Sequence, residues 1–135
     1  MQIDTSHPIA FKRTGIPTID DQHGQLVSYL ERLLNWIERG YGFAATLDAL
    51  QFLFDYTRTH FEFEEQLMRE HGYPRLAEHI EKHRAIEQGL GRVRSDLESG
   101  KDVEVDLTAT LRKWIVEHID VEDFEYALFM GTATR

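Results

Sequence analysis

The chain of 135 residues has a net charge of −9, no cysteine and a hydrophobic fraction of 41%. This length allows one domain with one hydrophobic core, and the composition is that of a globular chain. The acidic balance argues against nucleic acid and against an anionic membrane surface as partners. The lack of cysteine excludes disulfides, iron–sulfur clusters and zinc–thiolate sites.

The N-terminal stretch, about residues 1–18 and including His7, is predicted to be an arm. It contains no apolar run typical of a secretory signal, and no other segment is apolar for long enough to cross a bilayer. Together with the lack of cysteine, this favours a cytoplasmic protein. We therefore expect neither a membrane nor a nucleic acid as partner.

Glycine and proline divide the remainder into four helical segments. We predict helices over about residues 20–39, 44–71, 75–99 and 105–130. Asp20, after Gly15 and Pro17, is the expected N-cap of the first helix. A glycine is expected to end each of the first three helices, in order Gly40, Gly72 and Gly100.

Each segment carries an apolar stripe with alternating three- and four-residue spacing, which is typical of an amphipathic helix. In chain order, the stripes contain Ile19, Leu26, Leu30, Leu33 and Ile37; Leu50, Leu53, Thr57, Leu67 and Met68; Leu76, Ile86, Leu90, Val93 and Leu97; and Leu107, Leu111, Trp114, Val121 and Leu128. No stretch alternates as a strand does. The sequence predicts an all-α, antiparallel up-down-up-down four-helix bundle forming a single domain over residues 1–135.

Polar residues fill a gap in every stripe: His23, His60, Glu64, His79, His83 and His118. Burying a polar group without a partner costs about 1–3 kcal/mol, so a small bundle cannot leave six of them unsatisfied. Counting along the helices at about 1.5 Å per residue places all six within a layer roughly 10 Å thick. The pairs His60/Glu64 and His79/His83 are spaced i, i+4 and so share a helix face. These residues are expected to bind something together, whereas His7 and His71 lie outside the layer.

Four segments carry a family resemblance: TGIPTIDDQH (14–23), YTRTHFEFEEQLM (56–68), HIEKH (79–83) and WIVEHIDVEDFEY (114–126). Their combined pattern of one His, then HxxxE, HxxxH and HxxxxD, resembles that of the hemerythrins, specifically the bacterial type, the bacteriohemerythrins. The resemblance implies a non-haem di-iron centre that binds dioxygen reversibly, for oxygen transport, storage or delivery. An oxygen-accepting protein would be a partner; the oligomeric state stays open, with a monomer as the simplest case.

The resemblance also implies the ligands. One iron would be held by His79, His83 and His118, and the other by His23 and His60. Glu64 and Asp123 would bridge the two ions, together with an oxo or hydroxo group. The iron with two histidines would keep one position open for dioxygen. Imidazole also suits zinc, copper and nickel, so ligand type alone does not identify the metal.

Two residues depart from simple expectations. Helical spacing would select Glu122, four residues after His118, whereas the family pattern selects Asp123 at the fifth position. If Asp123 bridges, the helix is expected to be wound wide, as in a π-bulge, near residues 118–123.

Phe11 stands where the family often has an arm tryptophan. Ile19, Phe61, Trp114 and Ile119 are expected either to exclude water from the site or to be core residues only.

Other functions remain open at this level. An oxygen or redox sensor would act through a partner, and an enzyme such as a peroxidase, an iron oxidase or a nitric oxide scavenger would use the open iron. We expect no enzyme, because no further acid–base group is placed to drive turnover. A phosphotransfer bundle needs only one exposed histidine and leaves the other core histidines unexplained.

Overall fold

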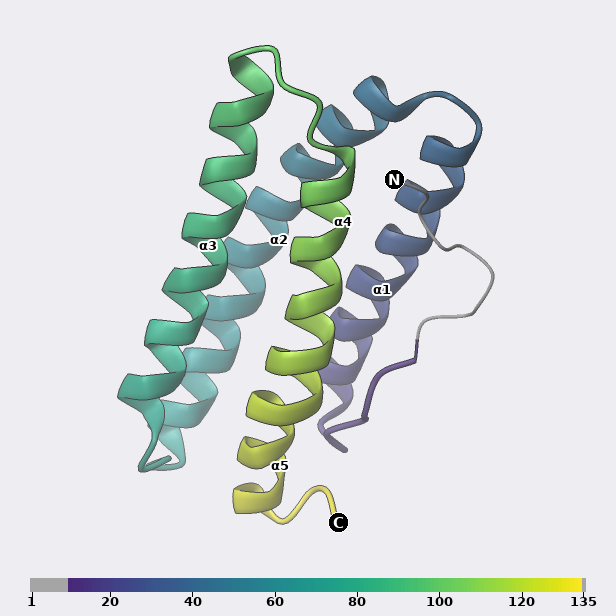
Figure 1. Cartoon of the computed structure of the whole chain (residues 1–135). Helices are drawn as coiled ribbons and strands as arrows, with labels where there is room; N and C mark the ends of the chain where they lie inside the picture. Colours follow the sequence, from purple (N-terminus) through teal and green to yellow (C-terminus); the bar gives the residue numbers. More distant parts are fainter. Residues whose placement is uncertain (1–9, 135) are drawn as a thin grey trace.

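The computed structural model describes residues 10–134, so the predictions for His7 and for the first half of the arm, residues 1–9, lie outside the described residues. Over this range the chain is all-helical, with α1 (Pro17–Glu38), α2 (Gly42–Glu70), α3 (Leu76–Glu98), α4 (Glu104–Lys113), η1 (Trp114–Asp123) and α5 (Phe124–Met130). The last three elements follow one another without a break and form the fourth helix. The four helices alternate in direction (Figure 1), which confirms the predicted antiparallel bundle.

Each helical stretch ends in the same turn around a glycine with positive φ: Gly40, Gly72, Gly100 and Gly131. After α1, Gly40 N–H donates to the carbonyl of Ile37, and Tyr41 N–H donates to the carbonyl of Trp36. This is the Schellman pattern, in which a left-handed residue satisfies the last carbonyls of the helix. The predicted glycine stops are confirmed, and the short turns bring neighbouring helices together.

The prediction that Asp20 is an N-cap is wrong, because α1 begins earlier, at Pro17, with Ile16 in the cap position. Proline is well suited to this first helical position, since its missing N–H has no helical partner there. Asp20 lies in the first turn, where its carboxylate accepts hydrogen bonds from Thr14 N–H at 2.7 Å and from Gly15 N–H at 3.1 Å. Asp20 therefore holds the described end of the arm against α1.

The core consists of two hydrophobic clusters, one on each side of a polar layer. The larger cluster lies toward the α1–α2 and α3–α4 turns and contains a fully buried leucine from each helix: Leu30, Leu53, Leu90 and Leu107. The smaller cluster lies toward the arm and α5 and contains Ile19, Met68, Tyr73 and Tyr126. The polar layer thus occupies the interior of the bundle at the level where the predicted stripes are interrupted.

The fourth helix is π-helical from Trp114 to Asp123, as the choice of Asp123 required. A π turn contains one more residue than an α turn, so residues five apart share a face there. The wider turn rotates Val121 out to solvent, where it is 55% exposed, so its predicted place in the core stripe is wrong. The same rotation brings Asp123 into the interior, 1% exposed, beside His118.

Within residues 10–134, no helix combines the length and apolar composition that are needed to cross a bilayer.

Candidate metal centre

The structure brings all seven predicted site residues together in the polar layer. None is more than 4% exposed: His23, His60, Glu64, His79, His83, His118 and Asp123. They come from α1, α2, α3 and η1, so every one of the four helices contributes. The i, i+4 pairs of α2 and α3 place two side chains each on the inner face, and the π turn adds a fifth-position pair from the fourth helix.

The potential ligand atoms fall into two groups that share both carboxylates. Glu64 and Asp123 belong to each group, where the ligand atoms lie within 4.8 Å of one another. Three imidazoles complete the first group, those of His79, His83 and His118; two complete the second, those of His23 and His60. Glu122 belongs to neither. The layer therefore offers two adjacent cation positions with unequal numbers of protein ligands.

All five imidazoles direct the same ring atom, Nε2, at this pair of carboxylates. The nearest carboxylate oxygen of Glu64 or Asp123 lies between 2.7 Å away, for His79, and 3.4 Å away, for His60. Neutral imidazole and carboxylate are the forms that bind first-row divalent metals. A common choice of ring nitrogen leaves Nδ1 of every ring free to face outward.

Three of the outward Nδ1 atoms meet an acceptor side chain. The Nδ1–H of His60 donates to Gln22 Oε1 at 2.6 Å, that of His83 donates to Glu65 Oε2 at 2.7 Å, and that of His118 donates to Glu122 Oε1 at 2.9 Å. Such outer hydrogen bonds orient a metal-binding imidazole and select the tautomer with its lone pair on Nε2. Glu122, the alternative to Asp123 at the sequence level, therefore supports His118 from outside the cluster.

Sequence reasoning missed these three acceptors, although each has a simple signature. Gln22, Glu65 and Glu122 are the immediate neighbours of His23, Glu64 and Asp123 in the sequence. A helix turns its next residue by about 100°, so a neighbour of an inward-facing side chain can face the adjoining helix. For Gln22 and Glu65 the donating histidine lies on the next helix, so these pairs can be found only when the bundle geometry is known.

Several buried polar atoms in the cluster have no hydrogen-bond partner among the described residues. They include Nε2 of His23, His60 and His118, Oε2 of Glu64 and both carboxylate oxygens of Asp123. Unsatisfied buried groups of this kind cost about 1–3 kcal/mol each. These imidazole nitrogens and carboxylate oxygens lie close together in two groups, so one cation in each group would satisfy their lone pairs. The residues present therefore fit a two-metal site.

The carboxylates and imidazoles shift one another's protonation in the metal-free protein. Burial alone would raise the pKa of Glu64, but the surrounding imidazoles lower it well below the ordinary value. Burial would lower the pKa of His79 and His118, yet Asp123 and Glu64 raise it to about 9 for His79, and Asp123 and Glu122 raise it to about 10 for His118. Burial lowers the pKa of His60 to about 4. His79 and His118 of the first group therefore keep a proton to higher pH than His60 of the second group does.

Aromatic rings enclose the imidazoles. Phe61 stacks on His83 with ring centroids 3.8 Å apart and planes 5° apart, and it also contacts His60 and His118. Phe11, which stands where the family often has an arm tryptophan, meets the ring of His23 edge-on, with the ring centroids 6.1 Å apart. The other predicted apolar neighbours, Ile19, Trp114 and Ile119, are buried as well. This shell keeps the cluster away from bulk water.

His71 lies outside the cluster, as expected. Its side chain is exposed at the end of α2, where its Nδ1–H donates to the carbonyl of Leu67 at 2.7 Å. A histidine in this position satisfies one of the last carbonyls of its own helix.

Comparison with known proteins agrees with the fold and the cluster. Residues 14–128 match the family described as hemerythrin HHE cation binding domain. The chain is 34% identical over 113 residues to the bacteriohemerythrin of Stenotrophomonas maltophilia (strain R551-3), a match covering 84% of this chain and 73% of the relative. The bacteriohemerythrin of Pseudomonas aeruginosa (strain LESB58) matches with the same identity and coverage. Myohemerythrin-1 of Phascolopsis gouldii is 32% identical over 77 residues, 57% of this chain and 60% of the relative.

The family match spans most of the chain and includes all seven residues of the cluster. The chain belongs to the hemerythrin family.

Proposed function

We propose that this protein binds dioxygen reversibly at a non-haem di-iron centre and serves in oxygen storage or delivery. The observation that carries the proposal is the pair of ligand groups sharing Glu64 and Asp123, buried in the interior and surrounded by five imidazoles that all present Nε2. Family membership supports it, because the matching domain is described as cation binding and the relatives are named hemerythrins.

Within this proposal, His79, His83 and His118 hold one iron, and His23 and His60 hold the other. Glu64 and Asp123, which belong to both ligand groups, would hold both ions, and an oxo or hydroxo group would complete the centre. The second position has one protein ligand fewer than the first, which leaves room for a small ligand. Iron bound there supplies reversible electron exchange with dioxygen.

The chain's own residues then hold and protect the site. The π turn of η1 delivers Asp123 to both metal positions. Phe61 fixes the plane of the His83 ring by stacking on it, and Phe11 covers the edge of His23. Buried apolar surroundings exclude water, which slows irreversible oxidation of the metal. Five neutral imidazoles stabilise highly oxidised iron less than a carboxylate-rich set does, and this favours binding of dioxygen over its cleavage.

The test is the visible spectrum of the iron-loaded, reduced protein before exposure to air, after exposure and after oxygen removal. We expect charge-transfer absorption that appears with dioxygen and disappears when it is removed. The variant His60→Ala should lose this response, whereas His71→Ala, which removes an exposed histidine just after the end of the same helix, should keep it. Irreversible oxidation of a fully iron-loaded wild-type protein would contradict the proposal and favour an enzyme or a redox sensor.

A further inference from the structure

The two ligand groups differ in the residues that support their imidazoles from outside. In the three-imidazole group, two rings donate Nδ1–H to carboxylates: His83 to Glu65 and His118 to Glu122. In the two-imidazole group, His60 donates to the neutral amide of Gln22. The buried Nδ1 of His23 has no hydrogen-bond partner among the described residues. The charge of the supporting acceptors is therefore concentrated at one position.

A carboxylate acceptor changes the imidazole more than an amide does. A hydrogen bond to a charged acceptor is roughly twice as strong as a neutral one, and it draws the Nδ1 proton toward the carboxylate. The ring then gains electron density, and its Nε2 becomes a more basic ligand for a metal ion. Ligands so supported bind divalent ions more tightly.

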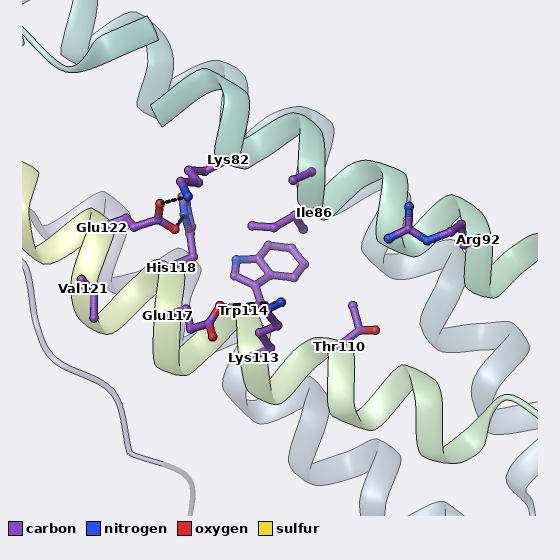
Figure 2. A pocket seen from close by; sticks show the side chains of 12 residues that line it. Lys82, Ile86, Arg92, Thr110, Lys113, Trp114, Glu117, His118, Val121 and Glu122 are labelled. Atoms are coloured by element: carbon purple, nitrogen blue, oxygen red, sulfur yellow. Dashed lines mark hydrogen bonds and ion pairs between the residues drawn. The ribbon is translucent and has the colours of Figure 1, made fainter. Parts of the chain in front are cut away.

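Both carboxylates are held in place from the solvent side. Arg84 Nη2 lies 2.9 Å and 3.1 Å from the two oxygens of Glu65, which is 12% exposed at its side chain. Glu122 lies between Lys82 Nζ, 3.9 Å away, and the Nδ1 of His118, at the edge of a groove between α3 and the fourth helix (Figure 2). The cations of Arg84 and Lys82 are about half exposed or more, so water screens their effect on the acceptor charge.

We propose that Glu65 and Glu122 rank the two metal positions, so that the position formed by His79, His83 and His118 binds its ion first and more tightly than the position formed by His23 and His60. This inference rests on the proposed two-metal site. Glu65 and Glu122 act as positioning residues, through His83 and His118. The number of imidazoles alone favours the same order, so the variants below separate the contribution of the two glutamates.

The experiment is a calorimetric titration of the full-length, metal-free protein with cobalt(II) without oxygen, followed in parallel by visible absorption. We expect two resolved binding steps. The isosteric variants Glu65→Gln and Glu122→Gln should each weaken the first step by about 10–100-fold, the range typical of outer hydrogen-bond partners, and leave the second step unchanged. Gln22→Glu should have the reverse effect: it should tighten the second binding step and so reduce the difference in affinity between the two steps.

The matched controls are Glu62→Gln on α2 and Glu117→Gln on η1, which remove the same charge from exposed side chains of the same helices. They should leave both steps as in the wild type. Thermal melting of the metal-free variants detects a merely structural effect, which would lower the melting temperature and weaken both steps together.

Two results overturn the inference in different ways. If both steps respond equally to Glu65→Gln and Glu122→Gln, or neither responds, the glutamates do not rank the positions, and the two-metal site stands. If the wild-type protein binds fewer than two cobalt ions, the two-metal site is wrong, and the proposed function fails with it.

Discussion

Asp123 Oδ2 lies 3.0 Å from His23 Nε2, which joins the fourth helix to the first at the centre of the bundle. Asp123 Oδ1 lies 2.9 Å from His79 Nε2 on the opposite side. One carboxylate thus faces both ligand groups, and this is the basis of the first prediction.

Replacing Asp123 by Asn should disrupt both metal positions, because the amide carries no charge and presents a single acceptor atom. We expect the variant to bind fewer than two iron ions and to lose reversible dioxygen absorption. Glu122→Gln, one residue earlier, should still bind two ions, with affinity lowered by about 10–100-fold at most. Metal analysis after gel filtration measures the number of iron ions that each variant retains. Two full equivalents of iron in Asp123→Asn would show that Glu122, or another group, bridges instead.

Removing the metal should destabilise the whole bundle. Seven buried ligands then lose their cations, and the free energy of unfolding falls by the binding free energy that is coupled to folding, about 4 kcal/mol for free metal at 1,000 times its dissociation constant. Thermal melting with and without a chelator measures the change. Refilling with metal is the control, since it should restore the melting temperature. Equal melting temperatures for the loaded and metal-free protein would count against a buried metal centre.

Metal uptake should release protons near neutral pH. In the metal-free protein His79 and His118 have pKa values raised to about 9 and about 10, so both rings are protonated at pH 7.5 and must lose a proton to present Nε2. Affinity should therefore rise with pH up to about pH 9–10, and about two protons should be released as the site fills. Calorimetry in two buffers of different ionisation enthalpy gives this number. A binding heat independent of the buffer would contradict the prediction.

Gly15→Ala should destabilise the loaded protein, because Gly15 has a φ of 77° and a Cβ there would lie 2.0 Å from the carbonyl oxygen of Thr132. The left-handed backbone alone costs about 1–2 kcal/mol, and the clash adds to it. Gly91→Ala is the opposing control: Gly91 lies exposed within α3 with open space around it, and the change should stabilise by about 0.5–1 kcal/mol. Urea unfolding measures the free energy of unfolding of both variants. An unchanged value for Gly15→Ala would show that the contact with Thr132 is dispensable.

Periodicity predicted the bundle and most of its interior from the sequence. His60, Glu64, His79 and His83 follow ordinary α-helical spacing, so their common face could be found by counting. The π turn could not be found by counting, because it does not keep the α-helical period. Counting alone favours Glu122 and places Val121 inside, whereas the structure buries Asp123 and exposes Val121. The family pattern supplied Asp123.

Local chemistry was ambiguous at two further points. Asp20 has the right residue type for an N-cap, yet Pro17 starts the helix earlier and turns Asp20 into an acceptor for Thr14 and Gly15. The supporting roles of Gln22 and Glu65 depend on which helix packs beside which, a long-range relationship that no local pattern contains.

The membership of Asp123 in both ligand groups also bears on when the site can form. During synthesis from the N-terminus, His23, His60, Glu64, His79 and His83 leave the ribosome well before residue 123. Neither metal position is complete until the fourth helix has emerged and wound its π turn. Metal loading must therefore follow translation of nearly the entire bundle, and a nascent chain that is arrested before Asp123 presents histidines without a finished site.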